Sequence, residues 1–543
     1  MPKVLVIGID GGAPQLIEQW RDKLPNFGKL MEEGYFGVLQ STVPPVTCPA
    51  WESFATGKNP GKLGLYDWTE MKIPYSPQLA RTSISEYTSF WDILGNAKKD
   101  TIILNIPMSY PAKPVNGIMV SGWPATKSKG DWVYPRYLAK KLEQSVKGYD
   151  FESSVLPPPT PTSSEKYFNR FLKGEYQYTE KIFLATKSLM QEYPWDLLMT
   201  TFTSTDRIQH FLWHFMDKTH PLHPQDCVTS LSEAILNIYK QIDQYLGELL
   251  RLVDKSTYVI ILSDHGFGPC HGKFSINSWL RQEGYLVSKK RQLTFNPLTR
   301  LLASEEKIRQ TAGGARLMNI VRKLTYHHTW LFKLVRLTTW RSMEDLISLV
   351  DFGQTRAVGW GSVVNTLYMN KEILQGQEYK KVKEQLIESL SKITHPLKGE
   401  KAVTEIHTTE EIYGKNYVGN PPDIMFVIDD YRYTQSSRLD SRLWLPPGIN
   451  TGTHRPEGLI MFKGPSIKSR GPRLTTNLTD LAPTILHIFG LPVPKDMDGR
   501  VLKELFREES EAAIIETKYQ EAGDEEKTKL RKRIIQLKSH KSM

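Results

Sequence analysis

KVLVIGIDGG at residues 3–12 and YVIILSDHGFG at residues 258–268 are the two stretches that decide the fold. Each is an apolar run of strand length that ends in an aspartate, Asp10 or Asp264, and each continues into glycines. Continuous apolar runs are typical of strands buried on both faces, and glycine allows the chain to turn sharply after a strand. The two stretches therefore predict buried strands with acidic side chains at their carboxyl ends.

Further runs of the same kind occur between these two. They are TIILNI (101–106), GIMVSGW (117–123) and DLLMTTF (196–202), and helical periodicity fills residues 165–192 and 226–253. Alternating strand and helix signals predict an α/β fold, with a mostly parallel central sheet and helices on both faces. Ligands of such sheets bind outside the carboxyl ends of the strands. We therefore expect Asp10, Asp206 and Asp264 to converge on one point.

The length of 543 residues allows one large domain with an insertion. Strand signals return in GLIMFKGP at 458–465, whereas much of the region before them is basic and amphipathic. We predict a catalytic α/β domain from residues 1–280 and 421–505, an inserted basic cap or substrate region at 281–420, and a charged C-terminal helix or tail at 506–543.

The net charge of +11 is concentrated in the predicted insertion. Residues 289–341 contain twelve basic and two acidic residues, interleaved with aromatic side chains such as Trp330 and Trp340. A solvated face of the cap is the favoured interpretation, because an apolar face in an insertion of this length usually packs on its own domain. The alternatives are an anionic membrane surface, at which the protein would be peripheral, and recognition of another polyanion, with nucleic acid disfavoured.

The sequence also predicts a compartment. The three cysteines, Cys48, Cys227 and Cys270, are an odd number without CxxC spacing, and no apolar run reaches the roughly 20 residues that span a bilayer. The first strand begins too early for a secretory signal. We expect a cytoplasmic, reduced protein, and its oligomeric state stays open.

Two of the strand-end aspartates have a histidine at metal-ligand spacing. Asp206 and His210 are four residues apart where a helix is expected, so both side chains lie on one helix face. Asp264 and His265 are adjacent and followed by glycine, so a turn could bring both to the same side. A helix-capping aspartate at Asp10 and a turn with a surface histidine at 264–265 are the alternatives. His214, one turn after His210, is expected to pack rather than to bind a metal.

PPVTCPAWESFATG at 44–57 contains the candidate nucleophile, Thr47. The pattern predicts that Thr47 lies immediately ahead of a short helix, with Pro49 in its first turn and Gly57 at its end. Backbone N–H groups and the helix dipole at such a position favour an anion. The alternative is a threonine that only caps the helix. His454, in GTHRPEG at 452–458, is the last candidate, and alone it would be an ordinary loop histidine.

Taken together, these motifs resemble the alkaline phosphatase superfamily, and within it the type I phosphodiesterase and nucleotide pyrophosphatase branch. The matching motifs are GIDGG, PPVTCPAW, STDRIQH, SDHGFGP and GTHRPEG, which occur in the family's order. The resemblance implies an alkaline phosphatase-like fold and two divalent metal ions, most suitably zinc, with manganese or iron acceptable. One ion would be held by Asp206, His210 and His454, and the other by Asp10, Asp264 and His265.

The resemblance further implies a hydrolase that acts on phosphoric esters of small molecules through a phosphothreonine at Thr47. A phosphomonoesterase, a phosphoglycerate mutase-like enzyme or a sulfatase-like enzyme are alternatives within the superfamily. A non-catalytic phosphate-binding scaffold is the alternative of another class. One position departs from the family pattern, because Asp67 and Trp68 stand where nucleotide pyrophosphatases have an asparagine. The resemblance therefore leaves the nucleotide specificity open.

Overall fold

The structure is a computed structural model that describes residues 2–72, 76–79, 87–127, 130–289, 349–361, 363–469 and 474–521. Most of the basic stretch at 289–341, and the end of the predicted tail from residue 522, therefore lie outside the described residues. Within the described ranges, no helix has the length and apolar character that are needed to cross a bilayer.

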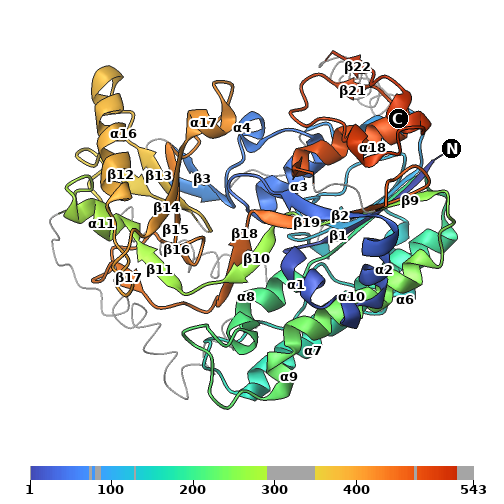
Figure 1. The fold of residues 1–543 in the computed structure, drawn as a ribbon, viewed down its shortest axis with the longest axis horizontal. Helices are drawn as coiled ribbons and strands as arrows, with labels where there is room; N and C mark the ends of the chain where they lie inside the picture. The colour runs from blue at the N-terminus through green and yellow to red at the C-terminus, as the bar shows by residue number, and fades with distance from the viewer. Residues whose placement is uncertain are drawn as a thin grey trace.

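A central sheet runs through the larger part of the molecule (Figure 1). Among the described residues it has nine strands, in the order β20, β2, β19, β9, β1, β8, β5, β6 and β7. In that order their bounds are Thr476–Asn477, Tyr35–Gln40, Glu457–Lys463, Thr257–Leu262, Lys3–Ile9, Leu197–Phe202, Thr101–Ile106, Gly117–Ser121 and Val133–Tyr134. The strands from β9 to β6 are parallel, whereas β19 is antiparallel to both of its neighbours. The predicted α/β fold with a mostly parallel sheet is confirmed.

Helices cover both faces of this sheet because its strands alternate their apolar side chains between two cores. On β1, Leu5 and Ile7 belong to one core, and Val4 and Val6 to the other. The first core is covered by α1 (Pro14–Gln19), α2 (Pro25–Glu33), α7 (Glu165–Glu192), α8 (Ser204–Met216) and α10 (Ala234–Leu250). The second is covered by α3 (Thr47–Thr56), α5 (Phe90–Asn96) and α18 (Leu481–Ile488). Figure 1 shows α3 and α18 on this face.

A small lobe lies beside the central sheet and has a core of its own (Figure 1). We define it as the described residues of 272–286 and 349–445. One sheet has the order β12 (Ala357–Gly359), β13 (Asn365–Met369), β15 (Ile424–Ile428) and β14 (Val403–Thr408), and the other β16 (Tyr433–Ser436), β11 (Gly272–Ser275) and β17 (Trp444–Leu445). The helices α11 (Ile276–Gln282), α16 (Gly376–Ser391) and α17 (Thr409–Tyr413) complete it. The lobe thus includes residues on both sides of 281–420, whose role as a separate unit stays a prediction.

Two further segments connect these parts. An antiparallel ribbon of β10 (Gly266–Pro269) and β18 (Gly452–Arg455) lies between the sheet and the small lobe (Figure 1). Beyond residue 505 the chain stays packed, since Phe506 is fully buried and β22 (Tyr519–Gln520) pairs with β21 (Val493–Pro494). The described part of the predicted tail is therefore part of the fold.

Candidate metal centre

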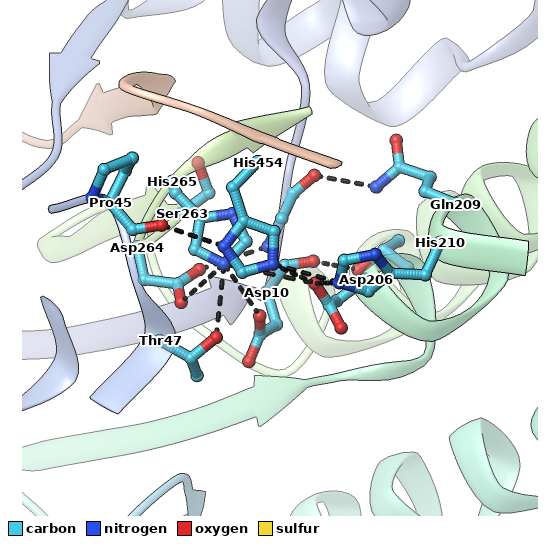
Figure 2. Close-up of polar contacts among 12 residues, drawn as sticks. Asp10, Pro45, Thr47, Asp206, Gln209, His210, Ser263, Asp264, His265 and His454 are labelled. Atoms are coloured by element: carbon cyan, nitrogen blue, oxygen red, sulfur yellow. Dashed lines mark hydrogen bonds and ion pairs between the residues drawn. The ribbon is translucent and has the colours of Figure 1, made fainter. Parts of the chain in front are cut away.

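Seven predicted side chains converge at the carboxyl edge of the central sheet (Figure 2). They come from the ends of β1 and β9, the first turn of α3, the first two turns of α8 and the β18 ribbon. They are Asp10, Thr47, Asp206, His210, Asp264, His265 and His454. Asp264 and His265 are completely buried, and Asp10, Thr47 and His454 are less than a tenth exposed. The structure thus brings together every candidate site residue that the sequence predicted.

Glycine is needed where the chain leaves β1. Gly11 has a φ of +64°, in the left-handed region that side chains disfavour. A Cβ atom there would also lie 3.0 Å from the Phe267 ring and 3.3 Å from the Cα of Asp206. The glycine lets β1 and α8 approach each other, and its N–H donates to Asp264 Oδ1 at 3.1 Å.

The Asp206 half of the centre consists of Asp206, His210 and His454. Asp206 Oδ1 lies 3.3 Å from His210 Nε2 and 3.2 Å from His454 Nε2, and the two Nε2 atoms are 3.0 Å apart. One oxygen and two nitrogens therefore face a common point, and all three ligand atoms lie within 4.8 Å of one another. This geometry suits a single divalent ion.

The Asp10 half consists of Asp10, Asp264 and His265, with Thr47 beside it. His265 Nε2 lies 3.3 Å from Asp264 Oδ2, 3.6 Å from Asp10 Oδ1 and 3.2 Å from Thr47 Oγ1. Asp206 Oδ1 is 4.0 Å from the same nitrogen, and Asp10, Asp206 and His265 form a second group with metal-ligand spacing. Asp206 therefore lies between the halves, although the resemblance assigned it to one half alone.

Backbone carbonyls fix the tautomer of all three histidines. The Nδ1 atoms of His210, His265 and His454 lie 3.0, 3.0 and 2.8 Å from the carbonyl oxygens of Gly452, Gly266 and Pro45. A carbonyl only accepts, so each Nδ1 carries the proton and donates it. Each neutral ring then directs the lone pair of Nε2 into the centre, which is the arrangement found in metal-ligating histidines.

The electrostatics of the two halves differ in sign. Burial and the neighbouring charges of Asp264 and Asp206 raise the pKa of Asp10, and burial is the largest cause that raises the pKa of Asp264, to about 8. Burial also acts to raise the pKa of Asp206, but His210 and His454 outweigh it and hold that pKa well below its usual range. Burial lowers the pKa of His265 and of His454, so both rings favour the neutral form that binds metals.

The donor set fits divalent cations. Asp10 Oδ1, Asp206 Oδ1 and Asp264 Oδ2 are buried, and none of them accepts a hydrogen bond from any residue in the described ranges. Buried carboxylate oxygens are costly without a partner, and three together repel one another. Oxygen and imidazole ligands in this mixture suit zinc, as well as manganese or iron.

Sequence reasoning missed the side chains that hold these ligands in place. Thr205 Oγ1 donates to the carbonyl of Asp10 at 2.6 Å, and Gln209 Nε2 donates to the carbonyl of Gly11 at 2.8 Å. Trp51 Nε1 donates to Asp10 Oδ2 at 3.4 Å. The spacing of four between Thr47 and Trp51 could have indicated that both project from one face of α3.

The helix that carries Thr47 begins one residue earlier than predicted. Val46 is the N-cap of α3, Thr47 is its first residue, and Gly57 ends it with a φ of +68°. Thr47 Oγ1 therefore does not cap the helix, which removes the alternative role that the sequence allowed. The other histidine of the α8 face, His214, is buried and bonded to Thr451 Oγ1 and the carbonyl of Pro161, as expected for a packing residue.

A sequence comparison with known protein families gives a match over most of the chain. The sequence profile of the family "Type I phosphodiesterase / nucleotide pyrophosphatase" matches residues 4–454. No curated protein matches the chain by sequence.

Several solved structures are similar over most of their length. Murine ectonucleotide pyrophosphatase/phosphodiesterase 5 is 12% identical, with a TM-score of 0.49, and the alignment covers 93% of this chain and 100% of the murine chain. For the human protein of the same name the identity is 13%, the TM-score 0.49 and the coverage 93% and 100%. Phosphonoacetate hydrolase from Sinorhizobium meliloti 1021, in complex with phosphonoacetate, is 14% identical with a TM-score of 0.48, covering 89% of this chain and 94% of that chain.

The family profile spans well over half of the chain and includes every candidate site residue from Asp10 to His454. The chain therefore belongs to the type I phosphodiesterase / nucleotide pyrophosphatase family and is a hydrolase of phosphoric esters.

Proposed function

We propose that the chain hydrolyses phosphodiester bonds in small phosphorylated substrates, with Thr47 as the nucleophile and two divalent cations as cofactors. The observation that carries the proposal is a set of three buried carboxylate oxygens, of Asp10, Asp206 and Asp264, which lie in the same cluster as Thr47 and accept no hydrogen bond within the described residues. A cluster of this kind is stable in ionised form only when cations neutralise it.

The six ligands divide into two sets. Asp206, His210 and His454 would hold one cation, and Asp10, Asp264 and His265 the other. Two bound cations supply charge neutralisation at the attacking and the leaving oxygen of an in-line displacement. Zinc is the favoured metal because nitrogen and oxygen ligands are equally represented.

Thr47 is placed to act as the nucleophile. Its Oγ1 lies 3.2 Å from His265 Nε2, inside the centre, and it begins α3, where the helix dipole stabilises the negative charge of a phosphoryl group. Oγ1 would bond to phosphorus while the phosphorus–oxygen bond to the first alcohol breaks, giving a phosphothreonine, and the proton lost from the Thr47 hydroxyl would balance the one gained by the departing alcohol. Water would then cleave this intermediate, which restores the Thr47 hydroxyl and releases a phosphomonoester.

The bond cleaved is thus a phosphodiester, and the alcohol that is released stays unassigned. Asp67, at the position where the family's nucleotide pyrophosphatases have asparagine, is buried and accepts from the backbone N–H of Trp68 at 2.6 Å. A carboxylate cannot donate to a phosphate oxygen as an amide does. Nucleotides are therefore one class of test substrate and not the proposed substrate.

The test is hydrolysis of bis-p-nitrophenyl phosphate and p-nitrophenyl phosphate by the zinc-loaded protein, with Thr47→Ala as the matched variant. We expect the diester to be cleaved at the higher kcat/KM and Thr47→Ala to lose turnover while retaining its metals. Faster cleavage of the monoester would favour a phosphomonoesterase. Full activity of Thr47→Ala would exclude the covalent route. A wild-type protein that binds no zinc after loading and cleaves neither ester would favour a scaffold.

A further inference from the structure

The loop that leads to Thr47 begins at Ser41, whose N–H donates to the carbonyl of Pro456 at 2.8 Å and whose Oγ donates to that of Asp264 at 2.5 Å. After Ser41 the loop is positioned mainly through its carbonyl groups. It has the sequence STVPPV at residues 41–46, and its two prolines have no N–H to donate. Three consecutive carbonyls each accept a hydrogen bond. That of Pro44 accepts from Thr42 Oγ1 and the N–H of Val46 within the loop, and that of Pro45 accepts from Nδ1 of His454 at 2.8 Å.

The third carbonyl, that of Val43, is held from the small lobe. Tyr413 Oη donates to it at 2.5 Å, across 370 positions of sequence. Tyr413 is the last residue of α17 and is only 6% exposed. Burial raises the pKa of Tyr413 well above its usual value, so its hydroxyl keeps its proton and donates throughout the working pH range.

Residues 409–418 of the small lobe, which include Tyr413, also contact the chain that follows α3. There, the N–H of Val418 donates to the carbonyl of Gly61 at 2.9 Å, and Tyr66 Oη donates to the carbonyl of Val418 at 2.7 Å. A Cβ atom on Gly61 would lie 2.6 Å from that of Tyr413, so only glycine allows α4 (Pro60–Leu63) to come this close to α17. Residues 409–418 therefore contact the chain both before and after the helix that begins with Thr47.

The position of Thr47 at the start of α3 matters because Oγ1 must approach phosphorus in line with the bond that breaks. A displacement of about 1 Å in a reacting group can reduce a rate by about 100-fold. Without the Tyr413 hydroxyl, the carbonyl of Val43 would lose its donor from the small lobe, while the bond between Pro45 and His454 would remain. The loop would then still be held at its start by Ser41 and at its end by His454, but it would lose its anchor to the small lobe in between.

We propose that Tyr413 is a positioning residue of the small lobe, which fixes the 41–46 loop and so aligns Thr47 Oγ1 with the metal centre. This inference rests on the proposed function of Thr47. It assigns to the small lobe a part in the chemical step, in addition to any part in substrate recognition. Within the described ranges, the hydroxyl of Tyr413 hydrogen-bonds to the carbonyl of Val43 and to none of the six proposed metal ligands.

The test compares Tyr413→Phe with Tyr379→Phe in the full-length, zinc-loaded protein. Tyr379 is the matched control, because its hydroxyl also donates at 2.5 Å but to Asp423 Oδ1 within the small lobe. With bis-p-nitrophenyl phosphate we expect kcat of Tyr413→Phe to fall about 10- to 100-fold with KM and metal content nearly unchanged. Tyr379→Phe should keep the wild-type kcat. Equal values of kcat in the two variants would overturn the inference.

Hydrogen exchange provides a readout that does not need turnover. The peptide covering residues 41–50 should exchange faster in Tyr413→Phe than in the wild type or Tyr379→Phe, both of which should match. If the zinc-loaded wild type cleaved no phosphodiester, the proposed function would fail, and exchange would still decide the role of Tyr413. Unchanged exchange of this peptide in Tyr413→Phe would overturn the inference even in an active enzyme.

Discussion

The two halves of the metal centre share their ligand types but differ in how the protein balances their charge. In the Asp206 half, two imidazoles lie within 3.3 Å of one carboxylate oxygen and hold the pKa of Asp206 low. In the Asp10 half, burial and neighbouring carboxylates raise the pKa of Asp10 and Asp264. The Asp206 half is therefore arranged for an ionised carboxylate by the protein alone, whereas the Asp10 half needs cations to keep its carboxylates ionised.

Thr47, the proposed nucleophile, lies beside the Asp10 half, which is the half that depends more on its cation. Thr47 Oγ1 contacts His265 and not His210 or His454 among the described contacts. Loss of the hydroxyl in Thr47→Ala should reduce kcat on a phosphodiester by about a thousandfold or more, since the covalent route disappears. Both metals should remain bound. Steady-state kinetics with metal analysis checks this, and a fall of less than tenfold would contradict the role of Thr47.

Metal removal should affect stability as well as activity. Chelation leaves the carboxylates of the Asp10 half without neutralising charge, so we expect loss of turnover and a fall in the free energy of unfolding. At a metal concentration of about 1,000 Kd the fall should be about 4 kcal/mol for each cation that binds, by mass action. Urea unfolding with and without chelator measures it. Equal stability of the two forms would show that no cation binds to the folded state.

Two aspartate variants should shift the stability of the metal-free protein in opposite directions. The folded pKa of Asp264 is about 8 and its unfolded value about 4, so from pH 4 to 8 the folded state retains a proton that the unfolded state releases. Asp264 thus lowers stability as the pH rises through this window, and Asp264→Asn should add about 2 kcal/mol at pH 8. Asp206 contributes stability above its unfolded pKa, which is lost as the pH falls, so Asp206→Asn should remove about 1–2 kcal/mol at pH 8.

The measurement is urea unfolding of both variants in chelator at pH 8. The wild-type protein under the same conditions is the reference. Shifts of the same sign would show that the two halves are electrostatically alike and would contradict the difference described above. In the presence of zinc both variants should instead bind metal less tightly than the wild type.

The smallest effect concerns His214, which lies on the same helix as His210 but outside the centre. Burial is the first cause that lowers its pKa to about 4, and the neighbouring His220 contributes. Its neutral form is therefore favoured by folding, so its contribution to stability is complete above about pH 6.5 and falls by about 1 kcal/mol per pH unit down to about pH 4. His214→Gln should remove this part of the slope in unfolding experiments at pH 4–7. An unchanged slope would contradict the role of burial at this residue.

Much of this centre could be predicted because its ligands follow local patterns. Asp10 and Asp264 end apolar strands, and Asp206 and His210 have helical spacing, so local rules place them at one edge of a parallel sheet. The strand β2 was not predicted, because glycine interrupts the short apolar run of YFGVLQ and its apolar residues do not alternate with polar ones. The antiparallel direction of β19 depends on its neighbours in space and has no local signal.

Contacts made across long stretches of sequence could not be predicted. The hydrogen bond from Tyr413 to Val43 joins the small lobe to the 41–46 loop, and no periodicity in either segment indicates it. Nor did any sequence signal show that Asp206 Oδ1 would lie 4.0 Å from His265 Nε2 and so between both halves. The ligand types were local properties, whereas their division between two cations depends on the packed geometry.

The metal content per chain of the wild type and of His210→Ala tests the two-cation centre most directly. Each protein would be loaded with zinc, freed of excess metal by gel filtration and analysed by plasma mass spectrometry. We expect two ions per wild-type chain and one per His210→Ala chain, because only the Asp206 half loses a ligand. A wild-type chain that holds one ion or none, or a His210→Ala chain that still holds two, would contradict this expectation.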